Sequence, residues 1–298
     1  MHQSPYILRS SIYSKVPPLT DPRVVLQRTD EVSTAFRMLS DPQTNTLVLT
    51  GDSGAGKSTL AALLFRGLEM AVQARQVPIR HMLWLSLGTN ATLPDVIATI
   101  LREVGAPNQD FSDFFMRKQE EQLALLRQAL SRPQESTFVV LDQFEALYDA
   151  KNSKEIVGRG AIPLFLNMLQ NNLGGSKVVL TSRISPFGKQ NDTDTCVRIN
   201  LVSRVSIPEG IALLQQRGIQ GSPEELSFIW QRCAGHVFAL ILFGALISLS
   251  GFSLSYLLNS PDYAFMWNGD VTFNLIGTAI NFLNPIQRTI LRTLCLFN

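Results

Sequence analysis

The chain has 298 residues, of which 45% are hydrophobic and 17% are charged, and its formal net charge is +2. This composition indicates a folded protein with a large core and excludes an intrinsically disordered chain. The weak net charge does not by itself predict nucleic-acid binding. Three cysteines, Cys196, Cys233 and Cys295, lie far apart without metal-ligand spacing, so we expect reduced, mostly structural thiols.

The N-terminal residues 1–22 are interrupted by four prolines and show no periodic pattern, so we expect an arm. They lack the apolar region of a signal peptide. The uncharged segment 237–249 is shorter than the roughly twenty residues of a membrane-spanning helix, so we expect a buried helix there. These features predict a cytoplasmic protein without a membrane partner.

From residue 23 onward, segments typical of strands alternate with helical patterns. Apolar runs typical of strands occupy residues 47–50, 79–87, 137–142, 177–181 and 196–201. Helical spacing of apolar residues covers 30–39, 60–65, 92–104, 120–130 and 162–173. This alternation predicts an α/β fold with right-handed βαβ units and a parallel sheet flanked by helices.

The strand pattern ends before Pro208, and helical patterns follow over residues 208–217, 224–233 and 236–249. This change indicates a domain boundary. We therefore expect the division 1–22 for an arm, 23–205 for the α/β domain, 206–282 for a small all-α subdomain and 283–298 for the beginning of a further domain. A helix over 286–296 would normally pack against a later segment, so we expect the chain to be truncated.

Residues 47–64 read LVLTGDSGAGKSTLAALL and contain the pattern G-x-x-x-x-G-K-[ST] between a strand and a helix. Glycines at three positions allow backbone conformations that are closed to other residues. Backbone amides and the N-terminus of the helix can then bind phosphates, the Lys57 ammonium can reach the β- and γ-phosphates, and the Ser58 hydroxyl can ligate Mg²⁺. We expect ATP or ADP with Mg²⁺, bound by Gly51, Asp52, Ser53, Gly54, Ala55, Gly56, Lys57, Ser58 and Thr59.

Three further side chains are candidates for catalysis. Asp142 ends an apolar strand and is suited to hold Mg²⁺, although a capping aspartate is the alternative. Glu145 can orient a water molecule or can be an exposed helix-start glutamate. Arg183 follows a strand expected beside that of Asp142, and its guanidinium can sense the γ-phosphate, although a surface arginine is the alternative. Gln143 cannot accept a proton usefully, so we expect slow hydrolysis.

Phe111, Phe114 and Phe115 lie close to Arg117 and Lys118 in the sequence. An aromatic and basic cluster can stack on nucleic-acid bases. A loop that packs on the core is the interpretation that we favour.

Five stretches, taken in chain order, resemble motifs of the STAND class of P-loop ATPases and, within it, the NB-ARC family. Residues 25–28 resemble the hhGR motif, with Gln27 in place of glycine, and residues 51–59 are the Walker A motif. FVVLDQFEAL at 138–147 is similar to the Walker B pattern, and GSKVVLTSR at 175–183 resembles the sensor-1 stretch. CAGHVFAL at 233–240 is similar to CxGHPLAL, with Val237 in place of the family proline.

The resemblance implies a switch that is closed with ADP at rest and self-associates with ATP, with effector or sensor modules outside this chain. It places Leu26, Gln27 and Arg28 near the adenine and Val237 near bound ADP. Because valine does not fix φ as proline does, we expect weaker locking by ADP. Residues 283–297 resemble the first helix of the family's winged-helix domain.

Two other functions stay open. An AAA+-type ATPase acting on DNA, in transposition or helicase loading, would form a ring and bind DNA in a salt-dependent manner. A scaffold that holds nucleotide without turnover is the second, and Gln143 favours it.

Overall fold

A computed structural model describes residues 12–17, 28–88, 90–105, 111, 113–132, 135–147, 161–171, 173–187, 195–201 and 204–295. The chain divides into two compact units. The first contains Arg28–Gly51 and Lys57–Asn200, and the second contains Leu201–Asn298, with which the loop Asp52–Gly56 is grouped. The four-part domain division expected from the sequence stays a prediction.

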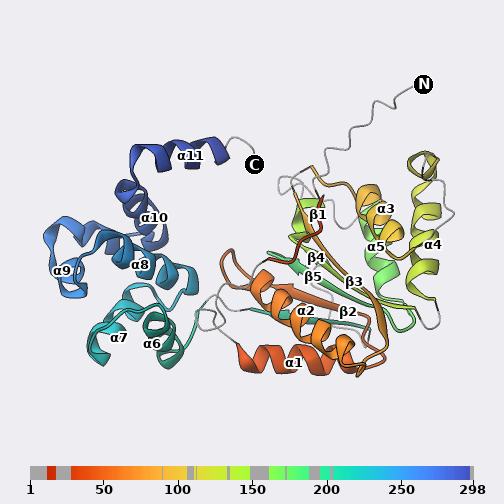
Figure 1. The fold of residues 1–298 in the computed structure, drawn as a ribbon, viewed down its shortest axis with the longest axis horizontal. Helices are drawn as coiled ribbons and strands as arrows, with labels where there is room; N and C mark the ends of the chain where they lie inside the picture. The colour runs from red at the N-terminus through yellow and green to blue at the C-terminus, as the bar shows by residue number, and fades with distance from the viewer. Residues whose placement is uncertain are drawn as a thin grey trace. The chain divides into compact units, whose positions relative to one another are not determined.

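The first unit contains one six-stranded sheet with the order β1-β3-β4-β5-β2-β6 (Figure 1). Strands β2 to β6 are parallel, which confirms the expected α/β fold. The antiparallel β1 pairs Ile12 with Leu87 at one edge, so a short part of the segment expected as an arm joins the sheet. A two-residue strand is too short to show alternation in the sequence. The strands are β1 Ile12–Tyr13, β2 Thr46–Thr50, β3 Ile79–Leu87, β4 Ser136–Asp142, β5 Lys177–Ser182 and β6 Cys196–Asn200.

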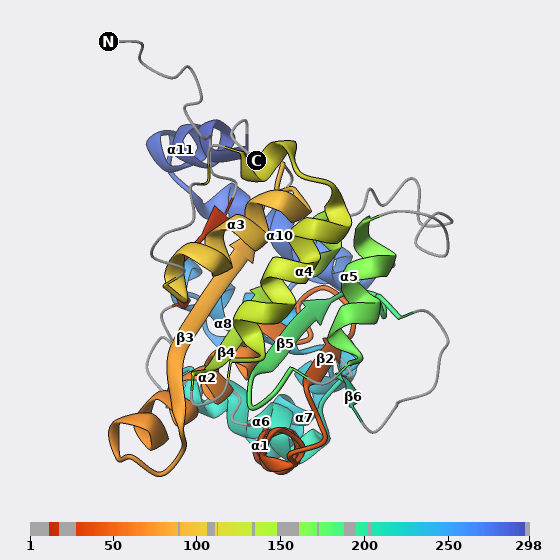
Figure 2. The ribbon, with the colours of Figure 1, turned by 90° about the vertical axis from the view of Figure 1, so that its right-hand side faces the viewer.

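Helices cover both faces of this sheet. Figures 1 and 2 show α1 and α2 on one face and α3, α4 and α5 on the other. This arrangement is the one that parallel strands require, because each crossover leaves a helix on a face. The helices are α1 Thr29–Ser40, α2 Lys57–Gln73, α3 Leu93–Glu103, α4 Gln119–Leu130 and α5 Ala161–Leu169, with short 3₁₀ turns η2 Phe114–Met116 and η3 Phe144–Leu147.

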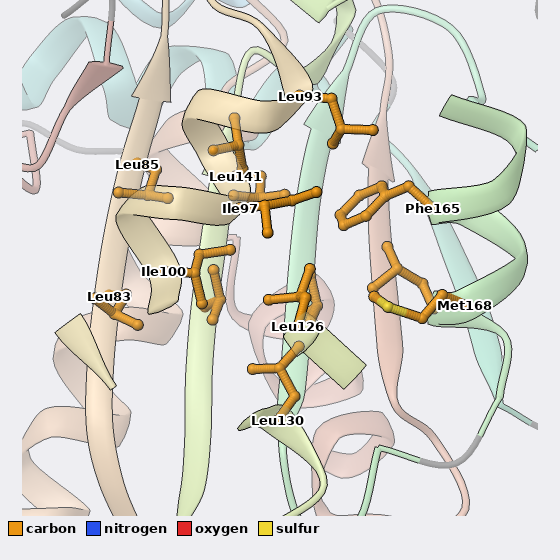
Figure 3. Close-up of a cluster of buried hydrophobic side chains, with 14 of the residues drawn as sticks. Leu83, Leu85, Leu93, Ile97, Ile100, Leu126, Leu130, Leu141, Phe165 and Met168 are labelled. Carbon is orange, nitrogen blue, oxygen red and sulfur yellow. The ribbon is translucent and has the colours of Figure 1, made fainter. Parts of the chain in front are cut away.

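The core between the sheet and α3, α4 and α5 is shown in Figure 3. There Leu85 and Leu141 of the sheet lie with Ile97 of α3, Leu126 of α4 and Phe165 of α5. On the opposite face of β4, the Phe138 ring packs against the Phe65 ring of α2, with ring centroids 5.9 Å apart. Strand β4 is therefore buried on both faces, which explains its continuous apolar sequence and fixes where its last residue emerges.

Two helix ends differ from the expectation. Helix α1 begins at Thr29, directly after Arg28 in a left-handed conformation, whereas the helical pattern was expected from residue 30. Helix α5 ends at Leu169, four residues before the expected Leu173. The Nδ2 of Asn45 donates a hydrogen bond of 2.7 Å to the Asn171 carbonyl, so a tertiary contact from the segment before β2 takes up backbone that a longer helix would use.

The second unit is all-helical within its described residues. Capping boxes begin α6 and α7, where Ser206 pairs with Glu209 and Ser222 pairs with Glu225. Three elements after residue 253, namely α9, η5 and α10, were not predicted from the sequence. The elements are α6 Ile207–Gln216, α7 Pro223–Arg232, α8 Val237–Ser250, α9 Leu254–Asn259, η5 Pro261–Trp267, α10 Val271–Phe282 and α11 Pro285–Cys295.

Helix α8 lies at the centre of the second unit's core. Its residues Leu240, Phe243 and Leu246 are fully buried. This confirms the expected buried helix over the uncharged segment. Among the described residues, no helix is both long and apolar enough to cross a membrane. The adjacent Cys233 is also buried, and burial raises the pKa of its thiol to about 12, which fits a structural, protonated cysteine.

Candidate functional site

The loop between β2 and α2 has the backbone that its glycines predict. Gly51, Gly54 and Gly56 have φ angles of 142°, 77° and 89°, which residues with a Cβ rarely adopt. The Ala55 N–H donates to the Asp52 carbonyl across the turn at 3.2 Å. The Lys57 Nζ donates to the Gly51 carbonyl at 2.8 Å, so the lysine spans the loop from its helical end to its strand end.

The end of β4 meets the first turn of α2 through a pair of side chains. The Ser58 Oγ donates a hydrogen bond of 2.7 Å to Asp142 Oδ1, although the two residues are far apart in the sequence. Asp142 is the last residue of β4 and is 3% exposed. The Thr181 Oγ1 of the neighbouring β5 donates to the same carboxylate oxygen at 2.6 Å. The two residues expected to ligate a metal are thus adjacent.

The donor set fits Mg²⁺. Asp142 takes part in no ion pair within the described part of the chain, and its buried carboxylate accepts hydrogen bonds from two neutral hydroxyls. A buried carboxylate is costly without a positive partner. Mg²⁺ usually takes one or two carboxylates together with waters and phosphate oxygens, rather than a cage of protein ligands. Accordingly, no group of three or more His, Cys, Asp or Glu that could hold a metal occurs among the described residues.

The other two candidate catalytic side chains contact each other. The Arg183 Nε lies 3.2 Å from Glu145 Oε1, and the side chains are 68% and 21% exposed, respectively. The second carboxylate oxygen of Glu145 is buried and has no hydrogen-bond partner among the residues that the structure describes. Strand β5, which Arg183 follows, does lie beside β4 as expected. The guanidinium expected to sense the γ-phosphate is therefore engaged by the carboxylate expected to orient water.

Gln143 connects these two pairs. It has a positive φ of 62°, and its N–H donates to Thr181 Oγ1 at 2.9 Å. Its side chain is exposed. A residue with a Cβ in this conformation is strained by about 1–2 kcal/mol, which points to a constrained junction between Asp142 and Glu145.

The Novel STAND NTPase 1 family model matches residues 20–202, which is more than half of the chain. The chain belongs to the Novel STAND NTPase 1 family. The match includes the P-loop, the Asp142 strand and the Arg183 stretch. No curated protein matches the sequence. The STAND class suggested by the motifs is therefore confirmed, whereas the NB-ARC assignment within it stays a prediction.

Solved structures share the fold of this STAND NTPase. A STAND protein with a tetratricopeptide repeat sensor from Pyrococcus horikoshii is 15% identical, with a TM-score of 0.55 over 90% of this chain and 41% of that one. A Walker-type ATPase of Pyrococcus abyssi is 13% identical, with a TM-score of 0.52 over 95% of this chain and 79% of that one.

The Aeropyrum pernix ORC1 protein in complex with DNA is 18% identical, with a TM-score of 0.55 over 97% of this chain and 78% of that one. At these identities the likeness shows the fold. The present chain spans less than half of the length of the Pyrococcus horikoshii STAND protein. The chain therefore belongs to a family of STAND NTPases and has the fold of P-loop ATPases.

Of the residues expected near the adenine in this STAND NTPase, Leu26 and Gln27 lie outside the described residues. Arg28 is 9% exposed, and its Nη1 donates to Glu31 Oε1 at 2.9 Å. Val237 is the first residue of α8 and is 6% exposed, packed in the second unit's core. Contacts of Arg28 and Val237 with nucleotide stay predictions.

The aromatic cluster packs on the core, as favoured above. Phe114 is 2% exposed, and Phe111 packs against the core of the first unit. The Arg102 guanidinium lies over the Phe111 ring, 5.1 Å from its centroid, so this ring makes a cation–π contact within the chain. A base-stacking surface formed by the cluster is therefore not supported, although Phe115 is exposed.

Thr181 is the site residue that reasoning from the sequence missed. Its hydroxyl contacts both Asp142 and the Gln143 backbone. The sequence does carry an indication of it, because a threonine follows the apolar run VVL in a strand expected beside β4. Carboxyl ends of neighbouring parallel strands meet at one edge, where ligands of α/β sheets bind.

Proposed function

We propose that this chain is an ATP/ADP-binding molecular switch with slow ATP hydrolysis. The observation that carries the proposal is the 2.7 Å contact between Ser58 of the P-loop helix and the buried Asp142. This contact joins the phosphate-binding loop to a strand-end carboxylate, and a Mg²⁺ ion bound to β- and γ-phosphates requires both groups. Mg²⁺ would supply electrostatic stabilisation of the phosphates, while the loop amides and Lys57 would hold and orient them.

Slow hydrolysis follows from the groups around the γ-phosphate position. Gln143 replaces a second acid and its amide cannot accept a proton. Glu145 is the remaining carboxylate candidate, and its Oε1 is held by Arg183. The contact with Arg183 occupies a carboxylate oxygen that would otherwise be available to orient the attacking water. A long-lived ATP state suits a switch.

We further propose that nucleotide exchange changes the arrangement of the two units and promotes self-association, as the STAND and NB-ARC resemblance implies. The Pyrococcus horikoshii relative carries a tetratricopeptide repeat sensor, and this chain spans 41% of it. A comparable sensor or effector module would act with this chain. Light scattering with ADP and with a non-hydrolysable ATP analogue tests self-association.

A second candidate is an ATPase that acts on DNA. The fold likeness to the Aeropyrum pernix ORC1 protein, whose structure contains DNA, favours this candidate. The net charge of +2 does not favour it. Binding of a fluorescent duplex at two salt concentrations separates the candidates, because phosphate contacts make DNA affinity fall steeply with salt. A scaffold that holds nucleotide without turnover is the third candidate. A steady-state ATPase assay distinguishes it, because a scaffold would show no hydrolysis.

Calorimetry with Mg²⁺-ADP tests the proposed nucleotide binding. Lys57→Ala removes an ammonium for which charge-assisted contacts to phosphate contribute about 1.5–3 kcal/mol each, so affinity should fall at least about 10- to 100-fold. Arg66→Ala is the matched control, because it removes an exposed positive charge from the same α2 helix. Wild-type affinity in Lys57→Ala would refute the P-loop site.

A further inference from the structure

The Thr181 hydroxyl makes two hydrogen bonds, and both go to the segment that ends β4. Thr181 is 1% exposed. Its single proton goes to Asp142 Oδ1 at 2.6 Å, and its oxygen accepts the Gln143 N–H at 2.9 Å. A hydroxyl has one proton and two lone pairs, so the donor and acceptor roles are assigned without ambiguity. One side chain thus fixes both the carboxylate and the peptide that follows it.

The second of these contacts holds a strained residue. Gln143 has φ of 62° and an exposed side chain, so burial of that side chain does not offset the strain. A left-handed conformation costs about 1–2 kcal/mol for a residue with a Cβ and persists where surrounding contacts determine it. The hydrogen bond to Thr181 is such a contact. The left-handed conformation of Gln143 turns the chain directly after Asp142.

Ser58 and Thr181 both donate to Asp142 Oδ1, but they differ in what they can do with a cation. Ser58 stands at the start of the P-loop helix, where its oxygen can ligate Mg²⁺. Thr181 stands on β5, is 1% exposed, and holds the Gln143 peptide as well as the carboxylate. Its position therefore suits orienting the carboxylate rather than ligating the ion.

We propose that Thr181 is a positioning residue for Mg²⁺: its hydroxyl presets the Asp142 carboxylate toward the cation and holds the Gln143 turn that ends β4. The inference rests on the proposed Mg²⁺-nucleotide site. Groups that orient a metal ligand typically contribute 10- to 100-fold to metal affinity. Thr181 then sets how much Mg²⁺ the bound nucleotide requires, without contacting the nucleotide.

The test compares three variants by titrating Mg²⁺ into protein with a fluorescent ATP analogue. Thr181→Val keeps the side-chain shape and removes the hydroxyl, whereas Thr181→Ser keeps the hydroxyl and removes the methyl group. Thr46→Val is the matched control, because Thr46 is a fully buried threonine of β2 whose hydroxyl donates to the Leu169 carbonyl at 3.1 Å. Thermal unfolding of each variant reports the structural cost separately.

We expect Thr181→Val to raise the Mg²⁺ concentration for half-maximal binding about 10- to 100-fold, with ADP affinity in EDTA changed less than about twofold. Thr181→Ser should stay within about threefold of wild type, and Thr46→Val should lower only the unfolding temperature. If Thr181→Val does not fold, Thr181→Ala, which lacks the hydroxyl and fits the same space, takes its place.

Two results would overturn the inference: a Mg²⁺ requirement in Thr181→Val no different from that in Thr46→Val, or an equal change in Thr181→Ser and Thr181→Val. Both would leave Mg²⁺-dependent nucleotide binding by the wild type intact. A wild-type protein that binds no nucleotide would instead refute the proposed function, and the inference with it.

Discussion

Asp142→Asn separates a metal-binding role of this side chain from a structural one. Asparagine keeps the shape of the buried side chain but removes its charge. The two hydroxyl donors, Ser58 and Thr181, would then make neutral hydrogen bonds, at a loss of about 1 kcal/mol each. Relief from burying an unpaired charge, which costs several kcal/mol, acts in the opposite direction. The metal-free variant should therefore keep its unfolding temperature within a few degrees.

The effect of Asp142→Asn on the affinity for Mg²⁺ should be much larger than its effect on stability. Unit charges about 4 Å apart attract by about 4 kcal/mol at an effective dielectric constant of 20, and Mg²⁺ carries two. Even a third of this doubled value corresponds to about a hundredfold loss of Mg²⁺ affinity. Asp142→Asn should thus abolish the part of ADP binding that depends on Mg²⁺ and leave binding in EDTA nearly unchanged.

Thermal unfolding with EDTA, with ADP in EDTA and with Mg²⁺-ADP measures this difference. A ligand at one hundred times its Kd stabilises the folded state by about 2.7 kcal/mol, which raises the unfolding temperature measurably. In wild type the shift with Mg²⁺-ADP should exceed that with ADP alone, whereas in Asp142→Asn the two should be equal. Asp113→Asn is the control, because Asp113 is an exposed carboxylate without a side-chain cap hydrogen bond. An equal loss of both shifts would refute the metal role and indicate a capping aspartate.

Two further variants test the remaining site residues. Arg183→Gln should weaken binding of an ATP analogue more than that of ADP, and equal losses for both nucleotides would argue against a γ-phosphate sensor. In a double-mutant cycle of unfolding free energies, the coupling between Arg183→Gln and Glu145→Gln should be at most about 1 kcal/mol, because Arg183 is 68% exposed. Val237→Pro suits the first position of α8, since the preceding His236 has an extended ψ of 116°, and should add about 0.5–1 kcal/mol of stability and slow ADP release. Faster release of a fluorescent ADP analogue from a folded variant would contradict placing Val237 near ADP.

The parts of the site that the sequence predicted are those fixed by local chemistry or by deep burial. The glycines of the P-loop and the helix start at Lys57 follow from backbone conformation and can be found in a short window. Asp142 was found because β4 is buried on both faces, so that its apolar run stops sharply at the first carboxylate.

The parts that were missed depend on contacts between distant segments. The pairing of Arg183 with Glu145 joins a residue after β5 to one in η3, and no spacing rule relates the two. The early end of α5 is likewise accompanied by a distant contact, the hydrogen bond from the Asn45 side chain to the Asn171 carbonyl. Helix α10 has few buried residues and begins at Val271, after the capping residue Asp270, in a segment without a clear apolar pattern.

Strand order explains why the missed residue stands where it does. In the sheet β5 lies between β4 and β2, so the strand that leads into the P-loop is not adjacent to the strand that carries Asp142. Ser58 reaches Asp142 from α2, and the intervening β5 brings Thr181 against the same carboxylate oxygen. Two residues further on, Arg183 contacts Glu145 from the same strand end. A shift of β5 relative to β4 would therefore disturb the proposed metal ligand and the Glu145 carboxylate together, because Thr181 contacts the first and Arg183 contacts the second.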